Sequence, residues 1–495
     1  MRAVFLLLAT VAAIAACGVQ GANPQAKDRL DQIISAFNSK DEAKVKAMIQ
    51  SSMAPAMFEK RKLEDWVAQT MQIAGDLAPL AVQKNLLDQP NAIVVEVKAG
   101  NGEKLGLRLD CESNPPHRIV GVRIDQNPET LLTERKKVDY STYTSLKDLA
   151  KRIQETVKAP AMAIATWRDG KLDVGVDGIR KMGTTEPVTD EDRWLVGSIG
   201  KSMTSTLIAT FIDEGKLNWT SKLGDLLKDI PMNAAYKDVT VEQVMQHLGG
   251  IPQDMGYTGP TVAKIVGALK DPTAIRASYV KDILNRDPIG KPGQKMAYSN
   301  AGYAILSHIA ERVGKKPFEQ LMKERVFDPI GMTSALCGMP GDDGMPSGKG
   351  QPHGHFSAKE GPRPGKMGGP LTHMAVGAGG GIACSIGDLA KYAAWHMNGF
   401  LGQTVPGLSS ATIKRLHTPM RKDARGEAYA AGWSVGTEAS PDAHGHNGSD
   451  GTFMAEMAFF PKEKLVVVGI VNVGFEGAQS PGVDAVMAVL KRVKG

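Results

Sequence analysis

The apolar positions in the first quarter of the chain change from a helical to a strand-like spacing. Apolar residues recur every three or four positions in three segments, which predicts helices over residues 28–37, 42–49 and 63–74. Four apolar runs separated by Gly, Pro and Asn follow and predict strands over residues 79–83, 92–97, 105–109 and 118–124. Helices followed by an antiparallel sheet predict a small α+β domain over residues 28–126.

The rest of the chain has strand patterns at both of its ends, with mostly helical sequence between them. The pattern first predicts a helix over residues 146–157 and a hairpin with strands over 161–167 and 172–176. Near the end it predicts two strands, over 452–460 and 465–473, and a closing amphipathic helix over 482–493. These strands predict one antiparallel sheet with an inserted helical region, an α+β fold and not a doubly wound α/β fold. We expect this domain to span residues 144–495, after a polar linker over residues 127–143.

The first predicted domain has no assignable role, and the second contains one long predicted loop of a kind that is usually functional or disordered. The order of elements in residues 28–126 resembles the cystatin-like or nuclear-transport-factor-like cone fold, and no convincing catalytic set occurs there. An accessory role in binding a peptide or a partner and a passive role as a spacer both stay open. Residues 338–381 are rich in Gly and Pro, which predicts a loop.

The beginning of the chain has the features of an export signal. In residues 1–16 one Arg precedes an apolar run that is shorter than the roughly 20 residues of a spanning helix and has no polar face. We interpret residues 1–16 as a signal peptide and residues 17–27 as a tether. The residues before Cys17 resemble a bacterial lipobox, which predicts lipidation of Cys17 and a periplasmic or outer-membrane lipoprotein. Cleavage without lipidation, and simple secretion, is the alternative.

Composition and charge exclude several classes of protein. A hydrophobic fraction of 42% with mixed charge excludes a disordered chain. The net charge of +6 is spread along 495 residues, so we expect no nucleic-acid partner and membrane contact only through a lipid anchor. The 4 Cys residues show no zinc-site spacing and are too few for a disulfide scaffold. The oligomeric state does not follow from the sequence.

The sharpest chemical feature is an S-x-x-K pair, Ser198 and Lys201, at the start of an apolar helix. A Ser in the first turn of a buried helix places its hydroxyl where backbone N–H groups and the positive end of the helix dipole converge. Lys201 lies one turn further on the same face, and burial favours a neutral amine that can take the Ser198 proton. We interpret a second S-x-x-K pair, Ser278 and Lys281, as an ordinary solvated helix face.

A Y-x-N motif, Tyr298 and Asn300, follows a Pro-Gly turn and opens another apolar helix. It is the only Y-x-N in the chain. Taken alone, the segment would favour a structural interpretation, with a Tyr packed under a turn and Asn300 acting as a helix N-cap.

An H-x-G motif, His446 and Gly448, stands before a predicted strand. Gly448 allows a substrate to approach the strand edge closely, because it has no side chain. The next backbone N–H, that of Ser449, can donate to an oxyanion.

The S-I-G-K, Y-S-N and H-N-G motifs, in this order, resemble those of the serine β-lactamase-related superfamily. That family includes class C β-lactamases, D-Ala-D-Ala carboxypeptidases and penicillin-binding-protein-like esterases. Further matches lie in residues 213–218, 239–247, 250–252 and 379–389. The resemblance covers about residues 145–494 and implies a β-lactamase/transpeptidase-like fold.

The resemblance also implies a role for each motif residue. Ser198 would be the nucleophile, and Lys201 and Tyr298 would share the general-base and proton-transfer work. The substrate would be contacted by four residues: Asn300, His446, Gly448 and Ser449. The oxyanion hole would consist of the backbone N–H groups of Ser198 and Ser449. Neither a metal nor an organic cofactor is implied.

The third motif departs from the family pattern, because most β-lactamases and peptidases have Lys-Thr-Gly where this chain has His446, Asn447 and Gly448. A His at this place resembles the esterase branch more closely. It therefore weakens the expectation of β-lactam or D-Ala-D-Ala specificity and leaves the acylation chemistry unchanged.

Two other patterns are rejected as sites. Residues 432–436 match G-x-S-x-G around Ser434, but the sequence before them is polar and no helical pattern follows, as a nucleophile elbow requires. The pairs His353/His355 and His444/His446 lack the carboxylate or third ligand that a zinc site needs.

The sequence therefore predicts an exported serine hydrolase that cleaves a small-molecule or peptide acyl substrate through a Ser198 acyl-enzyme, with esterase-type substrates favoured. A β-lactamase or D-Ala-D-Ala carboxypeptidase is the first alternative. A non-catalytic sensor that is acylated without turnover is the second.

Overall fold

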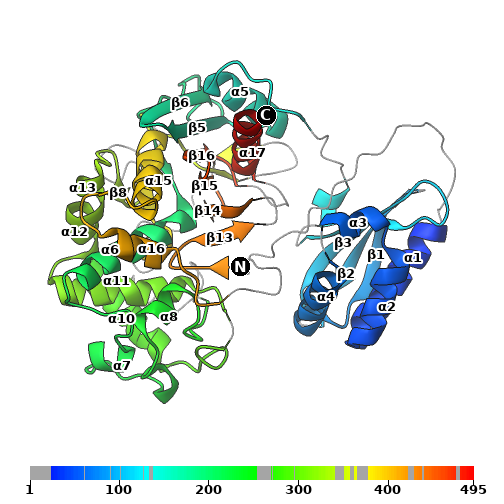
Figure 1. Cartoon of the computed structure of the whole chain (residues 1–495), viewed down its shortest axis with the longest axis horizontal. Coiled ribbons are helices and arrows are strands. Elements are labelled where there is room, and N and C mark those ends of the chain that lie inside the picture. The colour runs from blue at the N-terminus through cyan, green and yellow to red at the C-terminus, as the bar shows by residue number, and fades with distance from the viewer. Residues whose placement is uncertain are drawn as a thin grey trace. The chain divides into compact units, whose positions relative to one another are not determined.

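The chain forms two compact units, which meet in sequence between Val138 and Asp139 (Figure 1). This division falls inside the predicted linker over 127–143. The computed structural model describes residues 24–60, 62–89, 91–100, 102–125, 128–132, 138–253, 269, 271–294, 296–340, 350–356, 362–364, 377–421, 428–437, 440–474 and 480–495. The predicted signal peptide, Cys17 and most of the predicted loop over 338–381 lie outside the described residues.

The smaller unit packs helices against a four-stranded antiparallel sheet with the strand order β1-β2-β3-β4. Its elements are α1 (Pro24–Ser39), α2 (Glu42–Ser52), α3 (Pro55–Lys60), α4 (Leu63–Leu77), β1 (Ala81–Gln89), β2 (Ala92–Lys98), β3 (Lys104–Cys111) and β4 (Ile119–Asp125). One core joins side chains of α1, α2 and α4 to side chains of β2 and β3. The strand predicted over 79–83 in fact starts at Ala81 and runs to Gln89, because this exposed edge strand carries polar residues that hide its length from the hydrophobic pattern.

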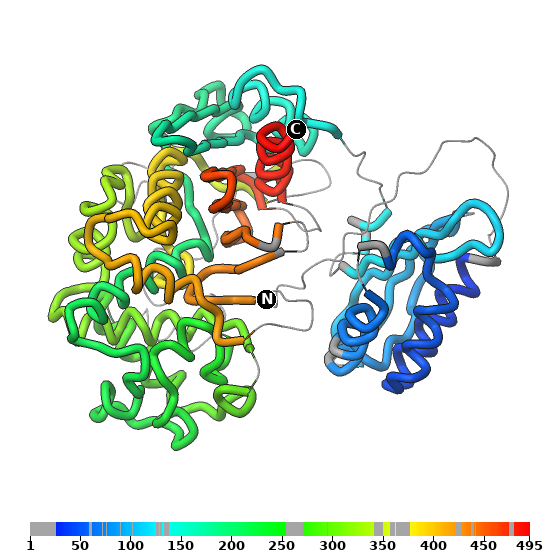
Figure 2. Tube along the Cα trace, in the orientation of Figure 1, coloured from blue at the N-terminus to red at the C-terminus, as the bar shows by residue number. Residues whose placement is uncertain are grey.

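The larger unit is built on a seven-stranded antiparallel sheet with the strand order β12-β13-β14-β15-β16-β5-β6. Its strands are β5 (Ala161–Arg168), β6 (Lys171–Gly178), β12 (Ala428–Tyr429), β13 (Ser434–Thr437), β14 (Ser440–Ser449), β15 (Met454–Phe460) and β16 (Leu465–Val471). β5 pairs with β16, so the two ends of this unit lie side by side (Figure 2). The predicted α+β sheet assembled from both ends is confirmed.

Helices cover both faces of this sheet. Met162, Ile164 and Val467 point to one face, where they share a core with α5 (Leu146–Val157) and α17 (Pro481–Lys494). Ala163 and Val468 point to the other face, toward α6 (Gly200–Asp213) and α15 (Ile386–Phe400). The alternation follows from the two-residue period of a strand.

The inserted region between β6 and β12 is largely helical, as predicted. Besides α6 and α15 it contains α7 (Leu223–Leu226), α8 (Val241–Met245), α10 (Pro272–Asn285), α11 (Asn300–Gly314), α12 (Phe318–Met322), α13 (Asp328–Ile330) and α16 (Ser410–Leu416), and the short strands β7 (Arg193–Leu195), β8 (Leu336–Cys337), β9 (His355–Phe356), β10 (Arg363–Pro364) and β11 (Ile382–Ser385). Within the described residues no helix has the length and apolar character needed to cross a bilayer.

Three strands of the seven-stranded sheet, β12, β13 and β14, were missed by the hydrophobic pattern. β14 (Ser440–Ser449) carries His446 and Gly448 and lies between β13 and β15, where the sequence predicted only loop before residue 452. Its residues are small or polar, so they give no strand signal, and pairing with β13 and β15 imposes the conformation instead.

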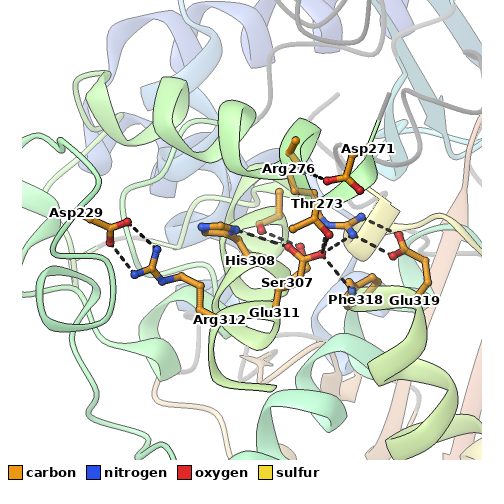
Figure 3. Close-up of polar contacts among 12 residues, drawn as sticks. Asp229, Asp271, Thr273, Arg276, Ser307, His308, Glu311, Arg312, Phe318 and Glu319 are labelled. Carbon is orange, nitrogen blue, oxygen red and sulfur yellow. Dashed lines mark hydrogen bonds and ion pairs between the residues drawn. The ribbon is translucent and has the colours of Figure 1, made fainter. Parts of the chain in front are cut away.

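A buried ion-pair network fastens α10 to α11 and α12 (Figure 3). Arg276 is 1% exposed, and its guanidinium donates to Glu311 at 2.5 Å and to Glu319 at 2.8 Å. Glu311, 5% exposed, also accepts hydrogen bonds from the Thr273 hydroxyl and the Phe318 backbone N–H. Arg312 and Asp229 form a second, solvent-exposed pair in the same view.

Replacing Arg276 by Met should lower the free energy of unfolding by about 3–5 kcal/mol, because it leaves the buried Glu311 carboxylate without its cation. The matched control is Arg312→Met, which removes an exposed pair and should cost no more than about 1 kcal/mol. Urea unfolding followed by circular dichroism measures both. Equal decreases in the free energy of unfolding of the two variants would contradict the conclusion that burial makes the Arg276 ion pair more important.

Candidate active site

Ser198 and Lys201 meet at the start of α6. Ser198 lies in the short 3₁₀ turn Gly197–Ile199 that leads into this helix. The Lys201 Nζ lies 2.9 Å from the Ser198 Oγ and donates to the carbonyl of Gly379 at 2.5 Å. Lys201 is 0% exposed, so its amine is held between the hydroxyl and the carbonyl without access to bulk water.

The close approach of two glycines brings β14 against this turn. Gly197 has φ +55°, and a Cβ placed on it would lie 2.4 Å from the Ser449 backbone nitrogen. A Cβ on Gly448 would lie 2.7 Å from the Ser198 backbone nitrogen. Any side chain at either position would therefore collide with the facing backbone. The two N–H groups predicted to form the oxyanion hole thus lie on segments in direct contact.

Tyr298 and Asn300 approach the same amine from the start of α11. The Lys201 Nζ lies 4.7 Å from the centroid of the Tyr298 ring. A Cβ on Gly379 would lie 3.3 Å from the Asn300 Oδ1 and 3.5 Å from the Lys201 Nζ. The structure therefore gathers Ser198, Lys201, Tyr298 and Asn300 around one point. The helix N-cap is Ser299, whose Oγ accepts the Gly302 N–H at 2.9 Å, so the alternative reading of Asn300 as the cap is wrong.

His446 projects from β14 into the same region and is neutral. Its Nε2 lies 2.9 Å from the hydroxyl of Tyr429, and its side chain is 5% exposed. Burial, with a smaller contribution from the charge of Lys201, lowers the pKa of His446 to about 3. At neutral pH this position therefore carries no positive charge.

Arg421 and Lys422 are two further cations that could bind the carboxylate of a substrate in place of His446. Arg421 is exposed and donates to the backbone carbonyl of Gln294 at 3.0 Å. Lys422, the other candidate cation, lies outside the described residues.

Comparison with known proteins identifies the family. The family model described as beta-lactamase matches residues 147–489. The chain belongs to the beta-lactamase family. Penicillin-binding protein 4 of Amycolatopsis lactamdurans is 23% identical over 331 residues, 64% of this chain and 81% of that protein. The unguisins hydrolase ungD' of Aspergillus campestris (strain IBT 28561) is 23% identical over 348 residues, 66% of this chain and 61% of that protein.

Solved structures agree with this assignment at the level of the fold. The class C beta-lactamase of Rhodobacter sphaeroides superposes with a TM-score of 0.56 and 17% identity, over 70% of this chain and 98% of that one. The predicted resemblance and the β-lactamase/transpeptidase-like fold are confirmed. As a member of the beta-lactamase family, the chain is a serine hydrolase of the kind that acts on amide or ester bonds.

Sequence reasoning missed two aromatic side chains in this beta-lactamase-family site. His247 follows α8, and its ring centroid lies 4.3 Å from that of Tyr298 and 4.7 Å from that of Tyr429. His247 stands in a segment that matched the family pattern, but no local spacing connects it to Tyr298. Tyr429, the partner of His446, lies just before the rejected G-x-S-x-G segment and has no signal of its own.

The two rejected patterns have structural roles. Gly432 has φ +80°, and a Cβ there would lie 2.5 Å from the Ser202 backbone nitrogen, so this glycine allows close packing on α6. Ser434 begins β13 and no helix follows it, which is not the geometry of a nucleophile elbow.

The His pairs also have partners of their own. His355 bonds to the backbone of Met182 and Asn472, and His444 bonds to His417 at 3.2 Å. Across the described ranges, no group of three or more His, Cys, Asp or Glu side chains is placed to hold a metal ion.

Proposed function

We propose that the chain hydrolyses ester or amide bonds through an acyl-enzyme on Ser198. The observation that carries this proposal is the 2.9 Å contact between the Ser198 Oγ and the Nζ of the fully buried Lys201. A hydroxyl becomes a useful nucleophile when an adjacent base can take its proton. The second group for moving that proton is the phenol hydroxyl of Tyr298, whose ring centroid lies 4.7 Å from the same amine.

The reaction follows from this arrangement. The Ser198 Oγ forms a bond to the substrate carbonyl carbon while its proton passes to the Lys201 and Tyr298 pair. The backbone N–H groups of Ser198 and Ser449 donate to the oxyanion that develops. The pair then protonates the departing oxygen or nitrogen as that bond breaks. Water attacks the acyl-enzyme, which releases the carboxylic acid and restores Ser198.

The charge of the site favours neutral acyl substrates, and we infer that short-chain esters are better substrates than anionic ones. A fixed Lys at the third motif would give a charge-assisted hydrogen bond to a substrate carboxylate. Here His446 is neutral and already bonded to Tyr429. Cleavage of β-lactams or D-Ala-D-Ala peptides is the second candidate, and the relation to penicillin-binding protein 4 favours it.

A substrate panel tests this proposal. Wild-type protein should turn over short-chain p-nitrophenyl esters continuously, and kcat/KM for the ester should exceed that for nitrocefin. The lost hydrogen bond to the carboxylate should account for roughly 10- to 150-fold of the difference. Because the pKa of His446 is lowered to about 3, the imidazole stays neutral and the preference should not change between pH 6 and 8.

The variant His446→Lys should reduce the ratio of kcat/KM for the ester to kcat/KM for nitrocefin, because it places a cation at the third motif. The matched control His446→Gln keeps a neutral side chain at this position and should leave that ratio of kcat/KM values unchanged. Efficient cleavage of nitrocefin or D-Ala-D-Ala peptides by the wild type would overturn the ester preference. A single burst of product without steady-state turnover of any substrate would instead support the acylated sensor.

A further inference from the structure

His247 holds the backbone on both sides of Tyr298. Its carbonyl oxygen accepts the N–H of Ala297 at 2.8 Å, and its Nδ1 accepts the N–H of Ser299 at 3.1 Å. Its imidazole packs on the ring of Tyr298, with 4.3 Å between the centroids. One residue therefore contacts the Tyr298 segment at three points: before the residue, after it and on its ring.

The backbone of His247 adopts an uncommon conformation at this contact. His247 has φ +58°, in the left-handed region that side chains other than Gly seldom adopt. Such a conformation is unfavourable by itself and persists where the surrounding structure enforces it, often at functional sites. The following residues continue the attachment, because the carbonyl of Leu248 accepts the Gly293 N–H at 2.7 Å.

The ring of His247 acts as an acceptor and not as an acid. Because Nδ1 accepts a backbone N–H, it carries no proton. Burial is the main cause that holds the pKa of His247 well below its usual value. In the described part of the chain its Nε2 has no hydrogen-bond partner, so the Ser299 bond is the one that a substitution of the ring would remove.

We propose that His247 is a positioning residue, which fixes Tyr298 beside Lys201 so that the proton of Ser198 can be transferred. This inference rests on the proposed function, because it gives Tyr298 a part in proton transfer. A displacement of about 1 Å at a reacting group can cost on the order of 100-fold in rate. Releasing the Tyr298 segment should therefore reduce kcat while leaving substrate binding nearly unchanged.

Two variants separate the contribution of the Nδ1 hydrogen-bond acceptor from that of ring packing on Tyr298. His247→Phe keeps a planar ring and removes the acceptor, so kcat for a p-nitrophenyl ester should fall by roughly 30- to 100-fold. His247→Asn keeps an acceptor close to the position of Nδ1 and tolerates the left-handed backbone, so most of kcat should be retained. In both variants KM should change by less than about threefold, as expected when only transition-state interactions are affected.

Hydrogen exchange provides a readout that does not require turnover. A peptide covering residues 297–299 should exchange faster in His247→Phe than in wild type, and His247→Asn should keep the wild-type protection. Exchange in the core of α11 should be unchanged in both variants. If the wild type cleaves no acyl substrate, the proposed function fails, and the exchange pattern alone then decides whether His247 holds this segment.

Two results would overturn the proposal. The first is His247→Phe with wild-type kcat and wild-type exchange at residues 297–299. The second is an equal loss of kcat and an equal rise of KM in both variants, with faster exchange along all of α11, which would show a general packing role only.

Discussion

Replacing Ser198 by Ala should reduce kcat/KM for a short-chain ester by about 10⁴-fold or more, the loss typical for removal of a serine nucleophile. The physical reason is that the Ser198 Oγ, 2.9 Å from the Lys201 amine, is the proposed nucleophile, so its removal leaves this amine without the hydroxyl that it activates. Steady-state kinetics on purified wild type and variant measure the effect. The thermal midpoint should stay close to that of wild type, since only one oxygen is removed.

The matched control for this variant is Ser434→Ala. Ser434 is the central residue of the G-x-S-x-G match, but it begins β13 and pairs with Tyr429 and Gly445 in the sheet. Its replacement should leave the rate within about twofold of wild type, as is usual for a side chain outside the reacting groups. Activity that survives in Ser198→Ala and disappears in Ser434→Ala would show that the nucleophile was assigned wrongly.

Replacing Lys201 by Met should reduce kcat by at least about 100-fold, the lower end for loss of a general acid–base group. Met keeps an unbranched apolar stem in the buried position and removes only the amine, so the effect on the Ser198 proton is isolated from packing. Reaction of Ser198 with a fluorophosphonate probe should slow in parallel, because both reactions need the same deprotonation.

The matched control for Lys201 is Lys281→Met, from the second S-x-x-K pair. Lys281 is exposed on α10, so its loss should leave the rate unchanged. Wild-type rates in Lys201→Met would remove Lys201 from the mechanism. Equal losses in the two Lys variants would point to a general effect of charge.

Part of the fold could be predicted because the hydrophobic pattern is strong where burial is one-sided or complete. The hairpin predicted over 161–167 and 172–176 appears as β5 and β6, and the late strands appear as β15 and β16. β14 could not be found in this way. Its residues are small or polar and give no strand signal, so its conformation is imposed by pairing with the neighbouring strands β13 and β15 and by the contact of Gly448 with the turn that holds Ser198.

The candidate site also combines contacts that local sequence predicts with contacts that only the tertiary structure shows. Ser198 and Lys201 are three residues apart where a 3₁₀ turn leads into α6, so local geometry alone predicts their contact. The contacts of His247 with Ser299 and of Tyr429 with His446 join segments that only the tertiary structure brings together. A single sequence has no spacing rule for such pairs. The charge state of His446 was likewise set by its burial, which the sequence did not reveal.

The central claim is a covalent bond between substrate and Ser198, and mass spectrometry of the trapped enzyme tests it most directly. Wild-type protein is mixed with a short-chain p-nitrophenyl ester, quenched in acid within the first turnover and digested for peptide mapping. We expect one acyl group per chain, on the peptide that contains Ser198, and none in Ser198→Ala. An acyl group on Ser434 or on any other residue would contradict the claim. Turnover of the ester without an adduct on Ser198, either from the ester under these conditions or from a fluorophosphonate, would also contradict it.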